Sequence, residues 1–165
     1  MGIVPYVHEY GSREGCVAEK KGGELKPVMT TDEINRFLVS VYPQLNTNKM
    51  DYHALDVFPG GCTVRLDANE RHLRPGDTVS GPSLFTLADI GGYVCVLSHA
   101  GPDALSVTTS LTINFMRKAG PGPIDGICRI LKLGRSLMVY DVDIMSAGVM
   151  VAHATGTYSI PPKRS

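Results

Sequence analysis

Asp89 stands out among the residues that could do chemistry, because it is the only charged residue between Asp77 and His99. A carboxylate among apolar residues must be hydrogen-bonded, paired with a cation or open to a pocket, since an unpartnered buried charge is costly. Such a group can act as a general base on water or as a nucleophile. From the residues alone, a structural role such as an ion pair with Arg74 stands slightly ahead of a catalytic one.

Just upstream, Ser80-Gly81-Pro82 has the composition of a helix start. Serine is among the best N-cap residues, and proline costs nothing in a first turn. Gly81 suits a tight entry into the helix, and its N–H would lie at the positive end of the helix dipole. A reaction oxygen that gains negative charge would be stabilised there, by about 3 kcal/mol for one donor. Pro82 cannot supply a second donor, because it has no N–H.

Residues 81 to about 98 are predicted to form the helix that carries Asp89. This segment is apolar on nearly every side, through Leu84, Phe85, Leu87, Ala88, Ile90, Val94, Cys95, Val96 and Leu97. A helix without a polar face must be enclosed by other elements. Gly91-Gly92 in its middle costs about 1 kcal/mol per residue relative to alanine, which indicates a close approach of the helix backbone to a sheet.

The enclosing elements are predicted to be β-strands. Residues 52–58 and 62–67 flank Pro59-Gly60-Gly61 and predict a hairpin. After the helix, residues 107–116 alternate apolar and polar side chains with the period of a strand. This strand is expected to form a four-strand antiparallel meander with residues 124–133, 137–146 and 149–160. The sequence therefore predicts an α+β domain in which a curved antiparallel sheet wraps around one long central helix.

The beginning of the chain is less regular. Residues 1–28 show no sustained period of 2 or 3.6, so we expect an N-terminal arm that is extended or partly ordered. Residues 29–165 are expected to form a single domain, with its first helix at about 30–42. Thr30 would cap that helix and Pro43 would end it.

Composition argues against several classes of function. The 165 residues are 43% apolar, which is enough for one sizeable core but marginal for two. Sixteen Lys and Arg balance 16 Asp and Glu, so no basic field would capture nucleic acid or an anionic membrane. The N-terminus does not resemble a signal peptide, and no segment has about 18 uninterrupted apolar residues. We therefore expect a soluble, cytoplasmic protein.

The cysteines and histidines show no metal-binding pattern. Cys16, Cys62, Cys95 and Cys128 are scattered without a CxxC pair, and the five histidines do not gather on one element. We expect reduced thiols, no metal and no cofactor.

The string VSGPSLFTLADIGGYV and the predicted order of elements together resemble the hotdog-fold thioesterase superfamily, in particular its phenylacetate-pathway (PaaI-like) acyl-CoA thioesterases. Those proteins carry His-Gly-Gly, a short apolar spacer and Leu-x-Asp at the start of the central helix. Aligning Asp89 with that carboxylate places Ser80, Gly81 and Pro82 on the triplet. The likeness covers about residues 51–160. The sequence departs from the pattern at Ser80, at Pro82 and at Arg74, where relatives often have Asn or Gln.

The resemblance implies hydrolysis of an acyl-CoA thioester to a free acid and coenzyme A, which would be part of the substrate rather than a cofactor. It makes Gly81 the oxyanion donor and Asp89 the general base or nucleophile, without deciding between the two routes. It also places the hydroxyl side chains of Tyr93 and Thr108 near the carboxylate or the water. The candidate substrate-binding residues are Arg74, Ser80, Pro82, Tyr93, Thr108, Arg117 and Lys118.

Several of these residues also have structural explanations. Ser80 is explained by capping alone, because no adjacent His would make it a nucleophile. Residues such as Tyr93 and Thr108 are more often explained by packing or by a sheet surface than by a pocket. Arg117 and Lys118 could hold the phosphates of coenzyme A, or they could be a solvated strand end.

Hotdog relatives pair sheet edges, so the resemblance implies a homodimer with the active site at the subunit interface, and homotetramers are also common among them. The polar row Thr108, Ser110, Thr112 and Asn114 would suit a half-buried surface. The first alternative function is a hotdog protein that binds acyl-CoA or another acyl ligand without hydrolysing it. An enoyl-CoA hydratase ranks third, because the D-x-N-P-x-H motif of that class is absent. The sequence does not indicate the acyl group.

Overall fold

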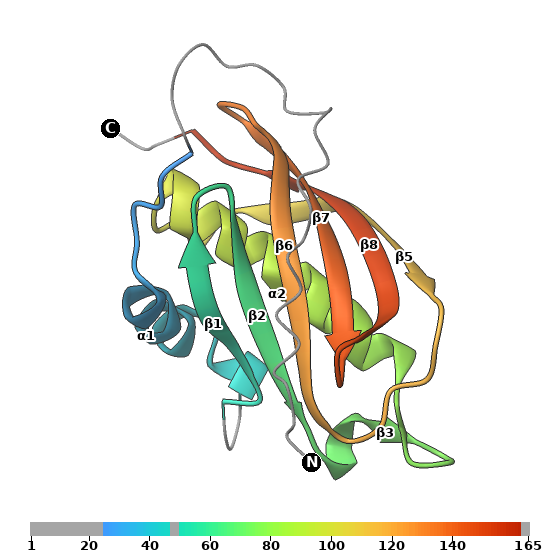
Figure 1. Ribbon diagram of the computed structural model, residues 1–165. Coiled ribbons are helices and arrows are strands. Elements are labelled where there is room, and N and C mark those ends of the chain that lie inside the picture. The colour runs from blue at the N-terminus through green and yellow to red at the C-terminus, as the bar shows by residue number, and fades with distance from the viewer. Residues whose placement is uncertain (1–24, 47–49, 163–165) are drawn as a thin grey trace, which may run out of the picture.

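One long helix, and a sheet that curves around it, make up most of the protein (Figure 1). The computed structural model describes residues 25–46 and 50–162. The N-terminal arm expected over residues 1–28 therefore lies outside the described residues, except for residues 25–28. The α+β class and the hotdog arrangement predicted from the sequence are confirmed.

Among the described residues, both α-helices begin at a capping side chain. Thr30 caps α1 (Thr31–Val41): its hydroxyl accepts from the Glu33 N–H at 3.3 Å, and the Glu33 carboxylate accepts from the Thr30 N–H at 2.8 Å. Ser80 caps α2 (Gly81–Ala100) by accepting from the Ser83 N–H at 3.3 Å. The helix bounds lie close to the expected 30–42 and 81–98.

Six strands form one antiparallel sheet in the order β1-β2-β6-β7-β8-β5. Their bounds are β1 (Tyr52–Phe58), β2 (Gly61–Ala68), β5 (Val107–Phe115), β6 (Gly122–Leu133), β7 (Leu137–Ser146) and β8 (Val149–Ser159). The predicted β1–β2 hairpin is confirmed. A separate two-stranded ribbon of β3 (Leu73–Arg74) and β4 (Thr78–Val79) precedes α2. Two short 3-10 helices are η1 (Pro43–Asn46) and η2 (Glu70–His72).

The expected four-strand meander is wrong for its first strand. β6, β7 and β8 pair in sequence order, but β5 pairs with β8 instead of β6. The reason is that β2 pairs with β6 along its whole length, so that edge of β6 is not open to β5. β5 consequently forms one outer edge of the sheet, and β1 forms the other.

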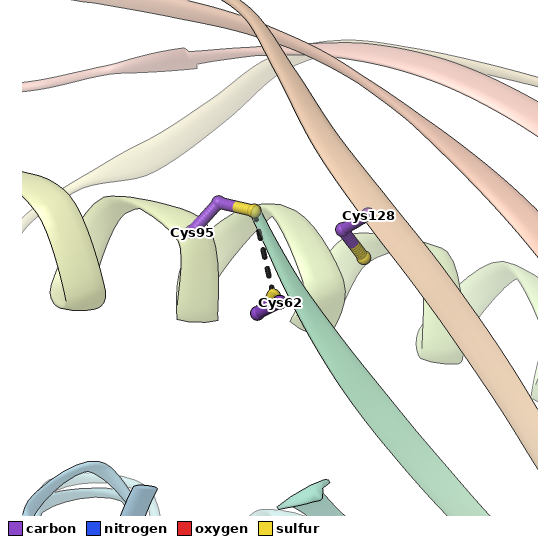
Figure 2. Close-up of side chains that lie close together, drawn as sticks. All are labelled: Cys62, Cys95 and Cys128. Carbon is purple, nitrogen blue, oxygen red and sulfur yellow. Dashed lines mark hydrogen bonds between the residues drawn. The ribbon is translucent and has the colours of Figure 1, made fainter. Parts of the chain in front are cut away.

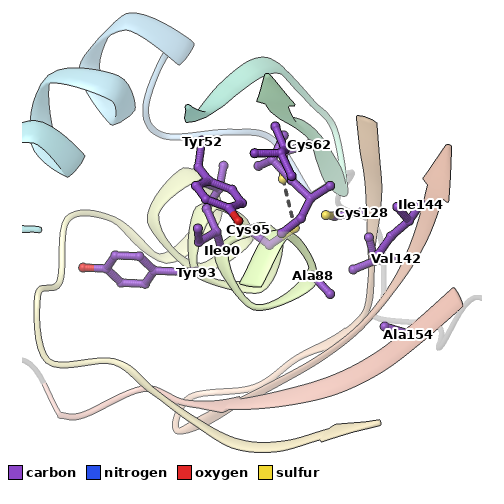
Figure 3. Close-up of a cluster of buried hydrophobic side chains, with 14 of the residues drawn as sticks. Tyr52, Cys62, Ala88, Ile90, Tyr93, Cys95, Cys128, Val142, Ile144 and Ala154 are labelled. Carbon is purple, nitrogen blue, oxygen red and sulfur yellow. Dashed lines mark hydrogen bonds between the residues drawn. The ribbon is translucent and has the colours of Figure 1, made fainter. Parts of the chain in front are cut away.

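The core lies between α2 and the sheet, as the buried side chains in Figure 3 show. Gly91 and Gly92 allow the close approach that the sequence predicted. A Cβ atom at Gly91 would lie 2.3 Å from Cys128 Sγ, and one at Gly92 would lie 2.3 Å from Tyr140 Cζ. Tyr140 is fully buried, and its hydroxyl donates to the Ala88 carbonyl of α2 at 3.2 Å.

Within the described chain, α2 is the helix that is long and apolar enough to cross a membrane by length and composition. In the structure, 78% of its most apolar 18-residue window is buried by the rest of the chain. This burial is what an enclosed core helix requires.

Candidate active site

Asp89 faces the paired strands β5 and β8 from α2. The Thr108 hydroxyl donates to Asp89 Oδ1. The Tyr158 hydroxyl lies 3.0 Å from the same oxygen and 2.9 Å from the Asp89 backbone carbonyl oxygen. Thr108 and Tyr158 are direct partners in the β5–β8 ladder, which is why both reach one carboxylate. The sequence prediction of a hydroxyl from Thr108 beside Asp89 agrees with this geometry.

The second carboxylate oxygen, Asp89 Oδ2, accepts no hydrogen bond from the described residues. The alternative explanation of Asp89, an ion pair with Arg74, is not among the ion pairs of residues 25–46 and 50–162. Asp89 is half-buried. Among the described residues, one of its carboxylate oxygens is hydrogen-bonded and the other is not. Such a carboxylate can take a proton from water or attack a carbonyl carbon.

Tyr158 is not among the residues predicted from the sequence. Burial raises the pKa of its phenol, and the neighbouring Asp89 carboxylate raises it further, so the hydroxyl remains a donor. Alternation along β8 did carry a signal, because Ala154, Gly156 and Tyr158 share the buried face of the strand. That alternation gives the face of Tyr158 but not the helix residue that it contacts.

Tyr93 reaches the Asp89 carboxylate only through Tyr158. Its ring stacks on the Tyr158 ring, with centroids 6.2 Å apart and an angle of 17° between the planes. Its hydroxyl donates to the Asp103 carbonyl at 3.0 Å. The structure therefore brings the Tyr93 ring to the site but directs its hydroxyl elsewhere.

The Gly81 N–H, the second predicted catalytic group, lies at the start of α2. The Ser83 N–H is capped by the Ser80 hydroxyl, and Pro82 has no N–H. The Gly81 N–H donates to no acceptor in the part of the chain that the structure describes. It is therefore a free donor at the positive end of the helix. Phe115 lies against this position, since a Cβ at Gly81 would be 3.3 Å from Phe115 Cζ.

His72 holds the chain segment that leads into α2. Its carbonyl accepts from the Ser80 N–H at 2.8 Å. Its imidazole is buried, with Nε2 4.0 Å from Asp51 Oδ2, and Asp51 also pairs with Arg71. A buried carboxylate with several partners fixes its surroundings. This network therefore sets the position of Gly81 relative to the sheet.

Gly81 and Asp89 lie too far apart on one helix to act on the same carbonyl group. They are eight positions apart on α2, and at a rise of 1.5 Å per residue this separates them by about 12 Å along the axis. A reacting carbonyl must lie about 3 Å from both its attacking group and its oxyanion donor. Within one chain, Gly81 and Asp89 therefore do not act together on one carbonyl group.

The other substrate-binding candidates lie at the surface. Arg74 is exposed at the end of β3, and Pro82 is exposed in the first turn of α2. Arg117 and Lys118 are exposed after β5, where the Arg117 guanidinium donates to the Met150 carbonyl at 3.2 Å. Their contact with coenzyme A stays a prediction.

Three of the cysteines, scattered in the sequence, meet in the core (Figure 2). Cys62 of β2, Cys95 of α2 and Cys128 of β6 have sulfur atoms within 4.8 Å of one another, and the Cys62 and Cys95 sulfurs are 3.4 Å apart. Soft metal ions take thiolate ligands. Three thiolates would, however, place several negative charges in an apolar core, and burial raises the pKa of Cys62 and of Cys128. The cluster is better explained as free, packed core thiols.

The chain is similar to several known proteins. A model of the thioesterase superfamily matches residues 76–153, which include Gly81 and Asp89. A proposed esterase of Pseudomonas aeruginosa is 33% identical over 100 residues, which cover 59% of this chain and 74% of the relative. The crystal structure of a proposed thioesterase from Silicibacter sp. TM1040 is 44% identical, with a TM-score of 0.75 over 84% of this chain and 96% of that one. A variant of the phenylacetic acid degradation protein PaaI from Thermus thermophilus is 26% identical, with a TM-score of 0.63 over 72% of this chain and 99% of that one.

Proposed function

Because the chain belongs to the thioesterase superfamily, we propose that it hydrolyses acyl-CoA thioesters to a free acid and coenzyme A. The observation that carries this proposal is the Asp89 carboxylate, whose Oδ1 is bound by the hydroxyls of Thr108 and Tyr158 and whose Oδ2 accepts no hydrogen bond from residues 25–46 and 50–162. The names of the relatives support hydrolysis of an ester or thioester. Acyl-CoA as the substrate is the finer part of the proposal.

In the proposed reaction, the Gly81 N–H donates to the thioester carbonyl oxygen and stabilises the charge that develops there. Asp89 Oδ2 then takes a proton from the water that attacks the carbonyl carbon. In the other route, Oδ2 attacks this carbon itself and forms a mixed anhydride that water opens. In both routes the carbon–sulfur bond breaks, coenzyme A leaves as a thiolate that takes up a proton, and water supplies the oxygen gained in hydrolysis.

The proposed site is built from two protomers, with Gly81 of one chain and Asp89 of the other on the same carbonyl group. The separation of about 12 Å along α2 within one chain supports this arrangement. β5, the strand that carries Thr108, is an outer edge of the sheet, and Val107 and Phe115 on it are 57% and 54% exposed. A homodimer would cover such an edge. Assembly of two dimers into a homotetramer is a further part of the proposal.

Arg117 and Lys118 are proposed to bind the phosphates of coenzyme A. They follow Phe115, whose ring lies against Gly81, so these cations lie on the side of the proposed oxyanion donor. The Arg117 guanidinium contacts only the neutral Met150 carbonyl among the described residues, which leaves its charge without a carboxylate partner. An unpaired guanidinium is suited to a diphosphate.

The second candidate function is binding of acyl-CoA without hydrolysis. Pro82 supports it, because a helix start with one free N–H gives a weaker oxyanion site than one with two. Ser80, at the place of the family's histidine, supports it as well.

Thiol release from phenylacetyl-, benzoyl-, short-chain and medium-chain acyl-CoA tests the proposal. Asp89→Asn is expected to lower kcat by about a hundredfold or more. The matched control Asp56→Asn removes an exposed carboxylate on β1 and is expected to retain full activity. Thermal unfolding of both variants shows whether they are folded.

Two results would contradict hydrolysis by Asp89. Undiminished turnover by Asp89→Asn would show that Asp89 is neither the general base nor the nucleophile. Absence of turnover by the wild type across the panel, together with measurable acyl-CoA binding by calorimetry, would favour the binding protein.

A further inference from the structure

We infer that Tyr158 is a positioning residue, which fixes the rotation of the Asp89 carboxylate so that Oδ2 is the oxygen that reacts. The inference rests on the proposed function of Asp89 and specifies which of its two oxygens carries that function. Tyr158 contacts Asp89 rather than the reacting atoms, so it acts through the carboxylate.

The first observation is that one phenol contacts both the backbone and the side chain of Asp89. Its oxygen lies 2.9 Å from the backbone carbonyl oxygen and 3.0 Å from Oδ1. The carbonyl is fixed in α2, so the phenol ties the carboxylate to the helix frame. The terminal torsion of aspartate is broad and roughly two-fold, so its two oxygens exchange easily without such a contact. Thr108 donates to the same Oδ1 from β5, which leaves Oδ2 without a hydrogen bond from the described part of the chain.

The second observation is that the Tyr158 ring itself is held rigidly. The side chain is 4% exposed, the Tyr93 ring stacks on one face of it, and the Tyr140 ring lies 6.0 Å away. The Tyr140 hydroxyl donates to the carbonyl of Ala88, the residue before Asp89. Two phenols of the sheet thus contact successive carbonyls of α2. A supporting shell of this kind holds a reacting group in its productive geometry.

Removal of the Tyr158 hydroxyl tests the inference. Tyr158→Phe is expected to lower kcat about tenfold with KM within about twofold, because the loss of one hydrogen bond affects the orientation of Asp89 but not substrate binding. The matched control Tyr42→Phe removes the hydroxyl of an exposed tyrosine at the end of α1, outside the candidate site. Its kcat is expected to stay within about twofold of the wild type. Unchanged kcat in Tyr158→Phe would overturn the inference.

A double-mutant cycle separates positioning from a general structural role. If Tyr158 acts through Asp89, adding Tyr158→Phe to Asp89→Asn lowers the residual rate no further. A tenfold loss in both backgrounds would overturn the inference.

Crystal structures test the geometry whether or not the wild type turns over a substrate, so failure of the proposed function and failure of this inference are distinguishable. In Tyr158→Phe we expect the Asp89 carboxylate to rotate or to occupy two conformers, and in Tyr42→Phe we expect it to stay in place. An unchanged single conformer in Tyr158→Phe would overturn the inference.

Discussion

A Cβ atom added to Gly92 would lie 2.3 Å from Tyr140 Cζ, so the Tyr140 ring occupies the space of a side chain at position 92. Gly156 of β8 bounds the same ring, since a Cβ there would lie 2.6 Å from Tyr140 Cε1. The ring fits because both positions lack a side chain. The contact brings α2 against the sheet one turn beyond Ala88, whose carbonyl accepts from the Tyr140 hydroxyl.

Gly92→Ala is therefore expected to destabilise the protein by about 1–3 kcal/mol, the usual cost of overpacking a core. This outcome opposes intrinsic propensity, by which alanine favours a helix by about 1 kcal/mol over glycine. Urea unfolding measures the difference. Gly120→Ala is the control, because an added Cβ there has no neighbour within 4 Å. A Gly92→Ala protein as stable as the wild type would contradict this packing.

Subunit mixing tests whether Gly81 and Asp89 act across a dimer interface. Gly81→Pro removes the free N–H and Asp89→Asn removes the carboxylate, so each variant alone is expected to be nearly inactive. After refolding of an equal mixture, half of the dimers are hybrids with one intact site each, and activity should return to about a quarter of the wild type. Native mass spectrometry counts the hybrids. Hybrids without activity would show that each site lies within one protomer.

Pro82→Ala supplies the N–H that the second helical position lacks. We expect kcat to rise about three- to tenfold, because a second donor would stabilise the oxyanion, with little change in KM. Stability should fall slightly, since proline restricts the unfolded chain. Thiol release and thermal unfolding measure both effects, and Pro75→Ala in the exposed β3–β4 turn is the control. An unaltered kcat would mean that the N–H at position 82 does not face the oxyanion.

Alkaline titration should show that Tyr140 and Tyr158 ionise late. Burial raises the pKa of Tyr140 and Tyr158 above the ordinary value of 10.0. Their unfolded forms lose the proton first, so this contribution to stability is complete below pH 10.0 and is lost as the pH rises above it. Tyrosinate absorbance should therefore show both groups ionising only when the protein unfolds. Tyr158→Phe should shrink this late phase, because it removes one of the two buried phenols.

The helices and strands were predictable because their signals are local. The capping residues Thr30 and Ser80 and the strand period of residues 107–116 each lie within one segment. The neighbour of β5 was not predictable in this way, because a period of two identifies a strand but not its partner. The partner of β5 depends on β2, because β2 pairs with the edge of β6 that β5 would otherwise use.

Asp89 could be singled out by its charge in an apolar helix, and the resemblance to the thioesterases added Gly81, whereas Tyr158 was not predicted. Tyr158 reaches Asp89 because β8 packs on α2, and the pairing of β5 with β8 brings Thr108 opposite Tyr158. The expected meander placed β5 beside β6 and so concealed this pair. The presence of both hydroxyls beside Asp89 thus depends on the order of the strands in the sheet.

The buried thiols of Cys62, Cys95 and Cys128 can be used to measure how often the core opens to a chemical reagent. Because the sulfurs come from β2, α2 and β6, loosening of one edge strand does not expose all three together. An alkylating reagent would therefore label them in molecules that have opened globally, and their added mass would count those molecules. A ligand that stabilises the folded protein should slow this labelling. The effect of a candidate ligand such as an acyl-CoA can therefore be followed in a crude extract, without an added dye.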